Sequence, residues 1–187
     1  KKISIILLTL SIMGTIFLNN ESLKERYYNQ INVIYSIDGF KKYYEESLYG
    51  AHQDAAYKIF QDNILFGVGL KNFRDESKKD IYENPDFKLT KGRVATHPHQ
   101  IHLELLSETG LFGYISFMIL ILSSIVISVK NYLTYKNPYQ LSALIYIISC
   151  LIPLVPTGSL FSTFFGGIFW FGFGLMISFN KNSKLKV

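Results

Sequence analysis

The chain has 187 residues, of which 49% are hydrophobic and 18% charged, and its net charge is +5. This composition excludes an ordinary soluble domain and is typical of a membrane protein with one sizeable polar segment. The single cysteine, Cys150, lies in an apolar run, which excludes a disulfide framework and a cysteine-based metal site. Residues 19–99 carry 12 basic and 12 acidic residues, so the excess charge flanks the apolar runs and gives no argument for nucleic acid.

Four apolar runs predict an all-α integral membrane protein with about four transmembrane helices. Residues 1–18 are expected to form a transmembrane helix rather than a cleaved signal peptide, because no small-residue cleavage site follows them. Residues 103–129 are expected to begin as a helix outside the membrane and to run into a span. Their uncharged part, 111–129, reaches roughly 28 Å as a helix, close to the thickness of bilayer hydrocarbon. Residues 141–179 are expected to form a transmembrane hairpin.

Lysines flank these runs on one side, which predicts their orientation. They precede the first run, lie in the loop 130–140 and close the chain in the tail 180–187. Positively charged flanks stay in the cytoplasm. The polar segment 19–102 is therefore expected on the outer face of the membrane.

The polar segment is expected to be partly helical. Ser22-Leu23-Lys24-Glu25 has the spacing of a capping box, which predicts a helix to about residue 37. The apolar stripe of residues 51–62 predicts a second helix. The Gly-x-Gly at Gly67 and Gly69 lacks a complete phosphate-binding pattern, so we expect a buried turn there. Residues 75–95 are charged and are expected to form a mobile loop.

Three of the four histidines, His97, His99 and His102, precede the second run. Pro98 suits the first turn of a helix, with Thr96 or His97 as its cap, and His99 and His102 would then share one face. Free N–H groups at such a helix start favour an anion, and a nearby arginine, Arg93, adds positive charge. An imidazole beside an anion site suits glycosyl transfer from a lipid diphosphate, because it can take a proton from a sugar hydroxyl.

Other interpretations of this cluster stay open. The three histidines with Glu104 could hold a metal, although the spacing is not that of a zinc peptidase. They could also be interfacial side chains without chemistry, in a non-catalytic component of polysaccharide assembly or export. Glu104 and Glu108 are expected to be helix-surface or helix-packing groups, and Gly110 and Gly113 are expected to allow close packing or a bend.

Two motifs resemble landmarks of the O-antigen ligase family. His99-Gln100, followed after nine residues by Gly110 and then by Gly113-Tyr114, resembles its signature. Residues 60–73 resemble its other landmark, a helix that ends at a Gly-x-Gly turn in the large periplasmic loop. Members often carry an arginine ahead of that helix, where this chain has Tyr49-Gly50-Ala51-His52. Full-length members have many more spans, so the chain is expected to be a C-terminal part.

The resemblance implies a GT-C-like, inverting glycosyltransferase of the bacterial inner membrane that needs no metal, nucleotide or other cofactor. It implies transfer of a glycan from undecaprenyl diphosphate to a periplasmic acceptor: lipid A core, a growing glycan or a protein. The family's essential histidine falls on His99, as base or transition-state stabiliser. We expect Arg93 and Arg74 to bind the diphosphate or glycan, and His97, Gln100 and His102 to lie against the substrate.

Overall fold

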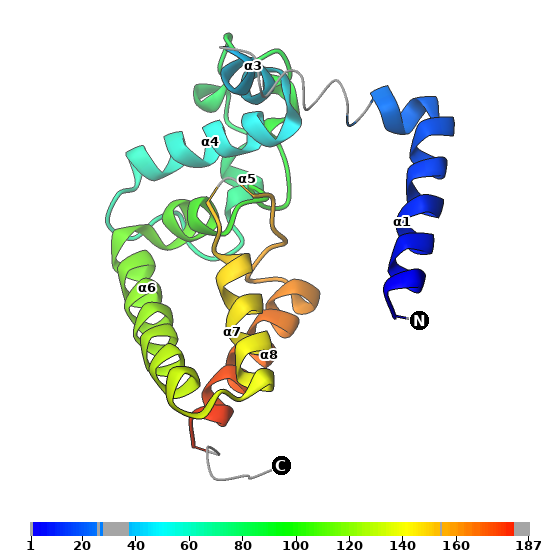
Figure 1. Cartoon of the computed structure of the whole chain (residues 1–187). Coiled ribbons are helices and arrows are strands. Elements are labelled where there is room, and N and C mark those ends of the chain that lie inside the picture. Colours follow the sequence, from blue (N-terminus) through cyan, green and yellow to red (C-terminus); the bar gives the residue numbers. More distant parts are fainter. Residues whose placement is uncertain (1, 26, 28–37, 154, 182–187) are drawn as a thin grey trace. The chain divides into compact units, whose positions relative to one another are not determined.

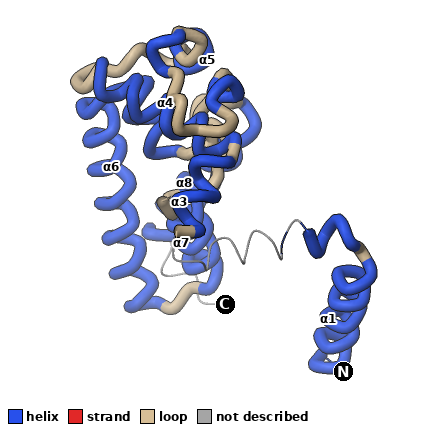
Figure 2. Tube along the Cα trace, turned by 90° about the horizontal axis from the view of Figure 1, so that it is seen from above, coloured by secondary structure: helices blue, strands red, loops and turns tan. Residues whose placement is uncertain are grey.

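The computed structural model describes residues 2–25, 27, 38–153 and 155–181, which form helices, turns and loops without any strand (Figure 2). The chain divides into two units, Lys1–Ser47 and Leu48–Val187. The first contains α1 (Lys2–Asn19), a helical stretch at residues 21–25, and α3 (Gly39–Glu46). Asn20 caps the stretch 21–25 by accepting the N–H of Leu23 at 3.1 Å. The helix predicted from Ser22 therefore starts one residue earlier, and most of its expected extent to residue 37 lies outside the described residues.

The longer helices described in the second unit are four in number, besides some short ones. They are α4 (Leu48–Asp62), α6 (Ile101–Tyr135), α7 (Pro138–Cys150) and α8 (Thr163–Lys181). Figure 1 shows α6, α7 and α8 side by side, with α4 packed against the first part of α6. The core between α6, α7 and α8 is apolar and includes Ile121, Ile147, Phe169 and Met176, all fully buried.

Among the described residues, two stretches are long and apolar enough to cross a membrane: Ile101–Tyr135 and Thr163–Asn180. Only 11% of the most apolar window of α6 is buried, so most of its apolar side chains face outward, as contact with lipid requires. The apolar stretches Ile6–Asn19 and Pro138–Cys150 are shorter. The other two predicted spans therefore stay predictions.

The ends of these helices differ from the sequence-based expectation. α6 continues to Tyr135 and stops where Lys136 takes a left-handed conformation, with φ of 54°. Asn137 then caps α7 by accepting the N–H of Tyr139, with Pro138 in the first turn. The predicted loop 130–140 thus shrinks to two residues. α7 ends at Cys150 and α8 begins at Thr163, so the predicted hairpin 141–179 contains two helices.

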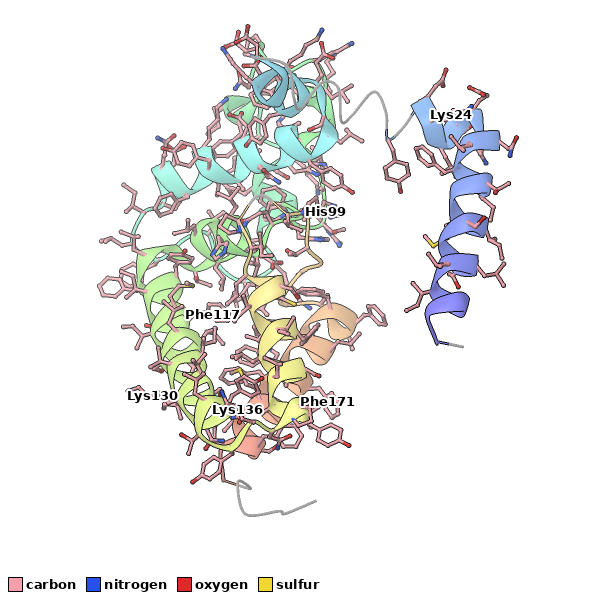
Figure 3. The ribbon with its side chains drawn as sticks, viewed as in Figure 1. Lys24, His99, Phe117, Lys130, Lys136 and Phe171 are labelled. Atoms are coloured by element: carbon pink, nitrogen blue, oxygen red, sulfur yellow. The ribbon has the colours of Figure 1, made fainter. Side chains whose placement is uncertain are left out.

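Figure 3 shows His99 at one end of the α6–α8 bundle and the two lysines Lys130 and Lys136 at the other. The histidine motif and the basic flank therefore lie at opposite ends of the longest helix. The candidate site lies at the His99 end of the bundle.

Candidate functional site

The two motifs that resemble the family's landmarks lie directly against each other. The turn at residues 64–69 donates the N–H groups of Val68 and Gly69 to the carbonyls of Ser107 and Glu108, at 3.0 and 2.9 Å. The carbonyls of the same turn accept the N–H groups of residues 111 and 112. These donors are free because the backbone of Gly110 leaves the helical range, with φ of 64° and ψ of −167°. The kink in α6 and the Gly-x-Gly turn therefore form one hydrogen-bonded unit.

Glycine is required on both sides of this contact. Gly67 has φ of 64°, and a Cβ there would overlap the backbone of Glu108 and Thr109. A Cβ on Gly110 would overlap the backbone of residues 65 and 66. The turn expected at Gly67 and the bend expected at Gly110 are confirmed, but the turn is not buried: Phe66 is 71% exposed and Gly67 is half-buried.

Two buried glutamates on α6 each hold a neighbouring loop. The carboxylate of Glu108 accepts the N–H of Lys71 at 2.7 Å and that of Phe73 at 3.2 Å. The carboxylate of Glu104 accepts the N–H of Leu160 at 2.7 Å. Of the two roles expected for these glutamates, surface or packing, the structure shows the packing one, since both are buried and each fixes a loop that lines the same pocket.

A pocket of about 620 Å³ lies where these two loops meet. One wall carries Lys71, Arg74 and Asp75, from the Gly-x-Gly turn and from α5 (Phe73–Glu76). Thr96 and His97 also line it, and the facing wall comes from the loop before α8 and its first turn, including Phe161, Phe164 and Phe165. The pocket therefore joins a charged wall to an aromatic one.

The charged wall is cationic in effect. Asp75 is paired with Lys78 at 2.6 Å, and this contact holds the pKa of the Asp75 carboxyl below its usual range. Among the described residues, neither Arg74 nor Lys71 forms a salt bridge with its side chain. Both cations are therefore available to an anionic ligand. Arg74 was predicted from the sequence as a ligand-binding residue, whereas Lys71 was not.

His99 lies just before α6, not on it. Its φ is 54°, in the left-handed region that non-glycine residues seldom adopt. The helix begins at Ile101 and is capped by Gln100, whose side-chain oxygen accepts the N–H of Leu103 at 2.7 Å. The N–H of Thr157 donates to the carbonyl of His99 at 2.8 Å. The expected cap at Thr96 or His97 is wrong, because the chain turns at His99 before the helix starts.

The ring of His99 is enclosed by three other rings. Its centroid lies 4.0 Å from that of His97 and 5.2 Å from that of His52, which is stacked on it at 29°. Tyr49 meets His99 edge-on at 5.5 Å. His52 and Tyr49 come from α4. His52 is a lone histidine 47 residues before His99, and no motif indicated that it would join the cluster.

Burial favours the neutral form of the three clustered histidines, His52, His97 and His99. It lowers the pKa of His99 below the usual value. Burial and the charge of a protonated His99 together lower the pKa of His97 to about 4, against a smaller opposite effect of the Thr157 backbone. The cluster therefore presents neutral imidazoles at neutral pH, which is the form that accepts a proton.

The remaining predicted site residues lie elsewhere. His102 makes contact between its Nε2 and the Leu151 carbonyl at 2.9 Å, and its Nδ1 lies 3.2 Å from the Tyr114 hydroxyl. It therefore does not share a face with His99, which is outside the helix. Gln100 is used as the helix cap. In the part of the chain that the structure describes, no group of three His, Cys, Asp or Glu side chains is arranged to hold a metal ion.

Arg93 organises the segment expected to be a mobile loop. Its guanidinium is 5% exposed and donates to the carbonyls of Thr90, Lys78 and Lys79. Around it the chain forms the short helices η1 (Asp80–Tyr82) and η2 (Thr90–Arg93), and η2 packs on α4. This part of the chain is therefore folded rather than irregular. Substrate binding by Arg93 stays a prediction, since its described hydrogen bonds all lie within this segment.

Membrane-length helices, with a histidine cluster and a pocket at one end, are the features of a helical membrane protein in the part of the chain that the structure describes. The family model described as O-antigen ligase matches residues 1–118, more than half of the chain. The chain belongs to the O-antigen ligase family. Searches of curated proteins and of solved structures gave no match. Family membership gives the chain a ligase- or glycosyltransferase-type role in polysaccharide assembly.

Proposed function

We propose that this chain carries the reaction centre of a glycosyltransferase that moves a glycan from undecaprenyl diphosphate to an acceptor hydroxyl in the periplasm. His99 is the base of this reaction. The observation that carries the proposal is the position of a neutral histidine cluster next to a pocket with one cationic and one aromatic wall. His97 belongs to both the pocket and the cluster.

The two walls match the two parts of a prenyl diphosphate. Arg74 and Lys71 offer positive charge to the diphosphate, and a guanidinium can form paired hydrogen bonds with phosphate oxygens. Phe161, Phe164 and Phe165 offer apolar surface to the first prenyl units. Because Phe164 and Phe165 begin a membrane-length helix, a lipid tail can pass from this wall into the bilayer.

The reaction needs one proton acceptor and one stabilised leaving group. Neutral His99 takes the proton of the acceptor hydroxyl, and the oxygen attacks the anomeric carbon. The glycosidic C–O bond breaks, and its electron pair departs with the diphosphate, whose charge Arg74 and Lys71 offset. Attack from the face opposite the diphosphate inverts the configuration. This chemistry uses no metal and no nucleotide, and it is the same for lipid A core, a growing glycan or a protein as acceptor.

Orientation follows from the lysines. Lys130 and Lys136 flank the far end of α6, and basic flanks favour the cytoplasmic side of an inner membrane. The His99 end would then face the periplasm, where lipid-linked glycans are used.

The test uses a substitution matched to the backbone. Asparagine tolerates the left-handed region, so His99→Asn removes the imidazole while keeping the turn. Lys136 has the same φ of 54° at the other end of α6, so Lys136→Asn is the control. Both variants are expressed in cells that make a lipid-linked surface glycan but lack their own ligase, and transferred glycan is measured against accumulated donor.

We expect His99→Asn to lose at least about 100-fold in transfer at unchanged protein level, within the range for a general base, while Lys136→Asn stays active. Transfer by wild type in membranes treated with a chelator supports the metal-free reaction. Equal transfer by His99→Asn and wild type would refute the assignment and would favour a non-catalytic role in assembly.

A further inference from the structure

His52 is a buried histidine that lies outside the pocket and against the His99 ring. Its side chain is 8% exposed, on α4, and its ring stacks on that of His99 at 5.2 Å. Neither the family match nor any motif assigns a role to it. Three of the chain's four histidines thus share one cluster, and two of them, His97 and His52, flank the proposed base.

The hydrogen bond of His52 fixes its tautomer. Its Nε2 lies 2.8 Å from the carbonyl oxygen of Gly92, which can only accept, so Nε2 carries the hydrogen. The Nδ1 atom therefore carries no hydrogen and keeps its lone pair. It is buried without a hydrogen-bond partner among the described residues. The ring is held neutral, in one orientation, against His99.

Groups from several segments face His99. They are His52 and Tyr49 from α4 and His97 from the segment before α6, while the turn after α7 contributes the N–H of Thr157. Burial and then the charge of protonated His99 lower the pKa of His52, against the Gly92 carbonyl, which raises it. The same charge lowers the pKa of His97. The charge of a protonated His99 thus acts on both neighbouring rings, in addition to their burial.

We infer that His52 is a positioning residue for His99: its neutral, stacked ring stabilises the imidazolium that His99 becomes when it takes the proton of the acceptor hydroxyl. The π face of a neutral aromatic ring attracts a cation, most strongly where water is excluded. In the step, the proton passes from the hydroxyl to His99, and His52 neither gains nor loses one. This inference rests on the proposed function.

Two substitutions separate the ring from the hydrogen bond. His52→Gln can still donate to the Gly92 carbonyl but has no ring, whereas His52→Phe keeps a ring over His99 and loses the hydrogen bond. For His52→Gln we expect kcat to fall about 5- to 30-fold with little change in KM, and the acid limb of kcat/KM to move about one pH unit lower. For His52→Phe we expect kcat and the acid limb near those of wild type.

The opposite pattern would overturn the inference. An active His52→Gln with a defective His52→Phe would make the Gly92 hydrogen bond a structural tie, and loss of folding in both variants would make His52 a packing residue. The pKa of His99, followed by NMR in histidine-labelled protein, should fall by about one unit in His52→Gln and not in His52→Phe. This titration needs no transfer. An inactive wild type would therefore reject the proposed function, while an unchanged His99 titration would reject the role of His52.

Discussion

Substitution of Gly67 by alanine tests whether the Gly-x-Gly turn and the kink in α6 act as one unit. The φ of 64° at Gly67 costs an alanine about 1–2 kcal/mol, because its Cβ approaches the carbonyl. The new Cβ also overlaps the backbone of Glu108 and Thr109, so the turn must move away. This motion breaks the hydrogen bonds from Val68 and Gly69, each worth about 0.5–1.5 kcal/mol.

The sum is a loss of about 2–5 kcal/mol in the free energy of unfolding. A control comes from Gly167 in α8, where an added Cβ meets nothing within 4 Å. Gly167→Ala should stabilise the helix by about 0.5–1 kcal/mol. The two alanine variants therefore have opposite signs, and thermal unfolding in detergent, followed by circular dichroism, separates them.

Gly67→Ala should also weaken binding of the lipid-linked donor. The turn carries Lys71 and Arg74 into the pocket, so the part of Gly67→Ala that stays folded should show a raised KM for the lipid-linked donor. Gly110→Ala strains the same contact from the other side, so the double variant should lose less than the sum of the single losses. The coupling of the two motifs would be refuted if Gly67→Ala had the same melting temperature as Gly167→Ala. It would also be refuted if the losses in unfolding free energy of Gly67→Ala and Gly110→Ala added up exactly in the double variant.

Three further predictions concern charge. First, transfer should fall as the pH drops through the pKa of His99, which burial holds below the usual 6.5, and half-maximal activity should lie below that pH in a rate profile. Stability should also fall between about pH 6.5 and 4, because unfolded chains protonate His97 there and the folded chain does not; pH-dependent melting checks this. Second, Arg93→Lys should loosen residues 78–93 and speed their limited proteolysis, whereas a diphosphate-binding Arg93 would lower donor affinity with the proteolysis pattern unchanged. Third, Glu104→Ala leaves the Leu160 N–H unpaired and should cost about 1–3 kcal/mol in thermal unfolding; an unchanged melting temperature would contradict the role of this carboxylate.

Local patterns predicted several elements because their causes are local. The apolar run 111–129 lies within α6, as its length and hydropathy require. The stripe of residues 51–62 forms most of α4, which starts only three residues earlier. The glycines at 67 and 110 were correctly assigned to a turn and a bend, since few other residues accept their backbone conformations.

The start of α6 was predicted wrongly for a physical reason. Pro98 favours a first helical turn, but the Thr157 N–H binds the carbonyl of His99 and Gln100 caps the helix that follows. These contacts accompany the left-handed backbone at His99. The Gln100 cap is local, but Thr157 lies far along the chain, and spacing alone cannot reveal that contact.

By itself, the sequence determined the helical class, the membrane character and the family, because hydropathy and motif residues are readable along the chain. Only the tertiary structure decided which residues surround His99. The structure stacks His52 of α4 on the His99 ring, and it places Lys71 and Arg74 together in the pocket wall. It also shows that the Arg93 side chain donates to backbone carbonyls of its own loop segment. The physical reason is that these groupings depend on long-range packing and on buried hydrogen bonds, such as those of Glu104 and Glu108, which join segments distant in sequence.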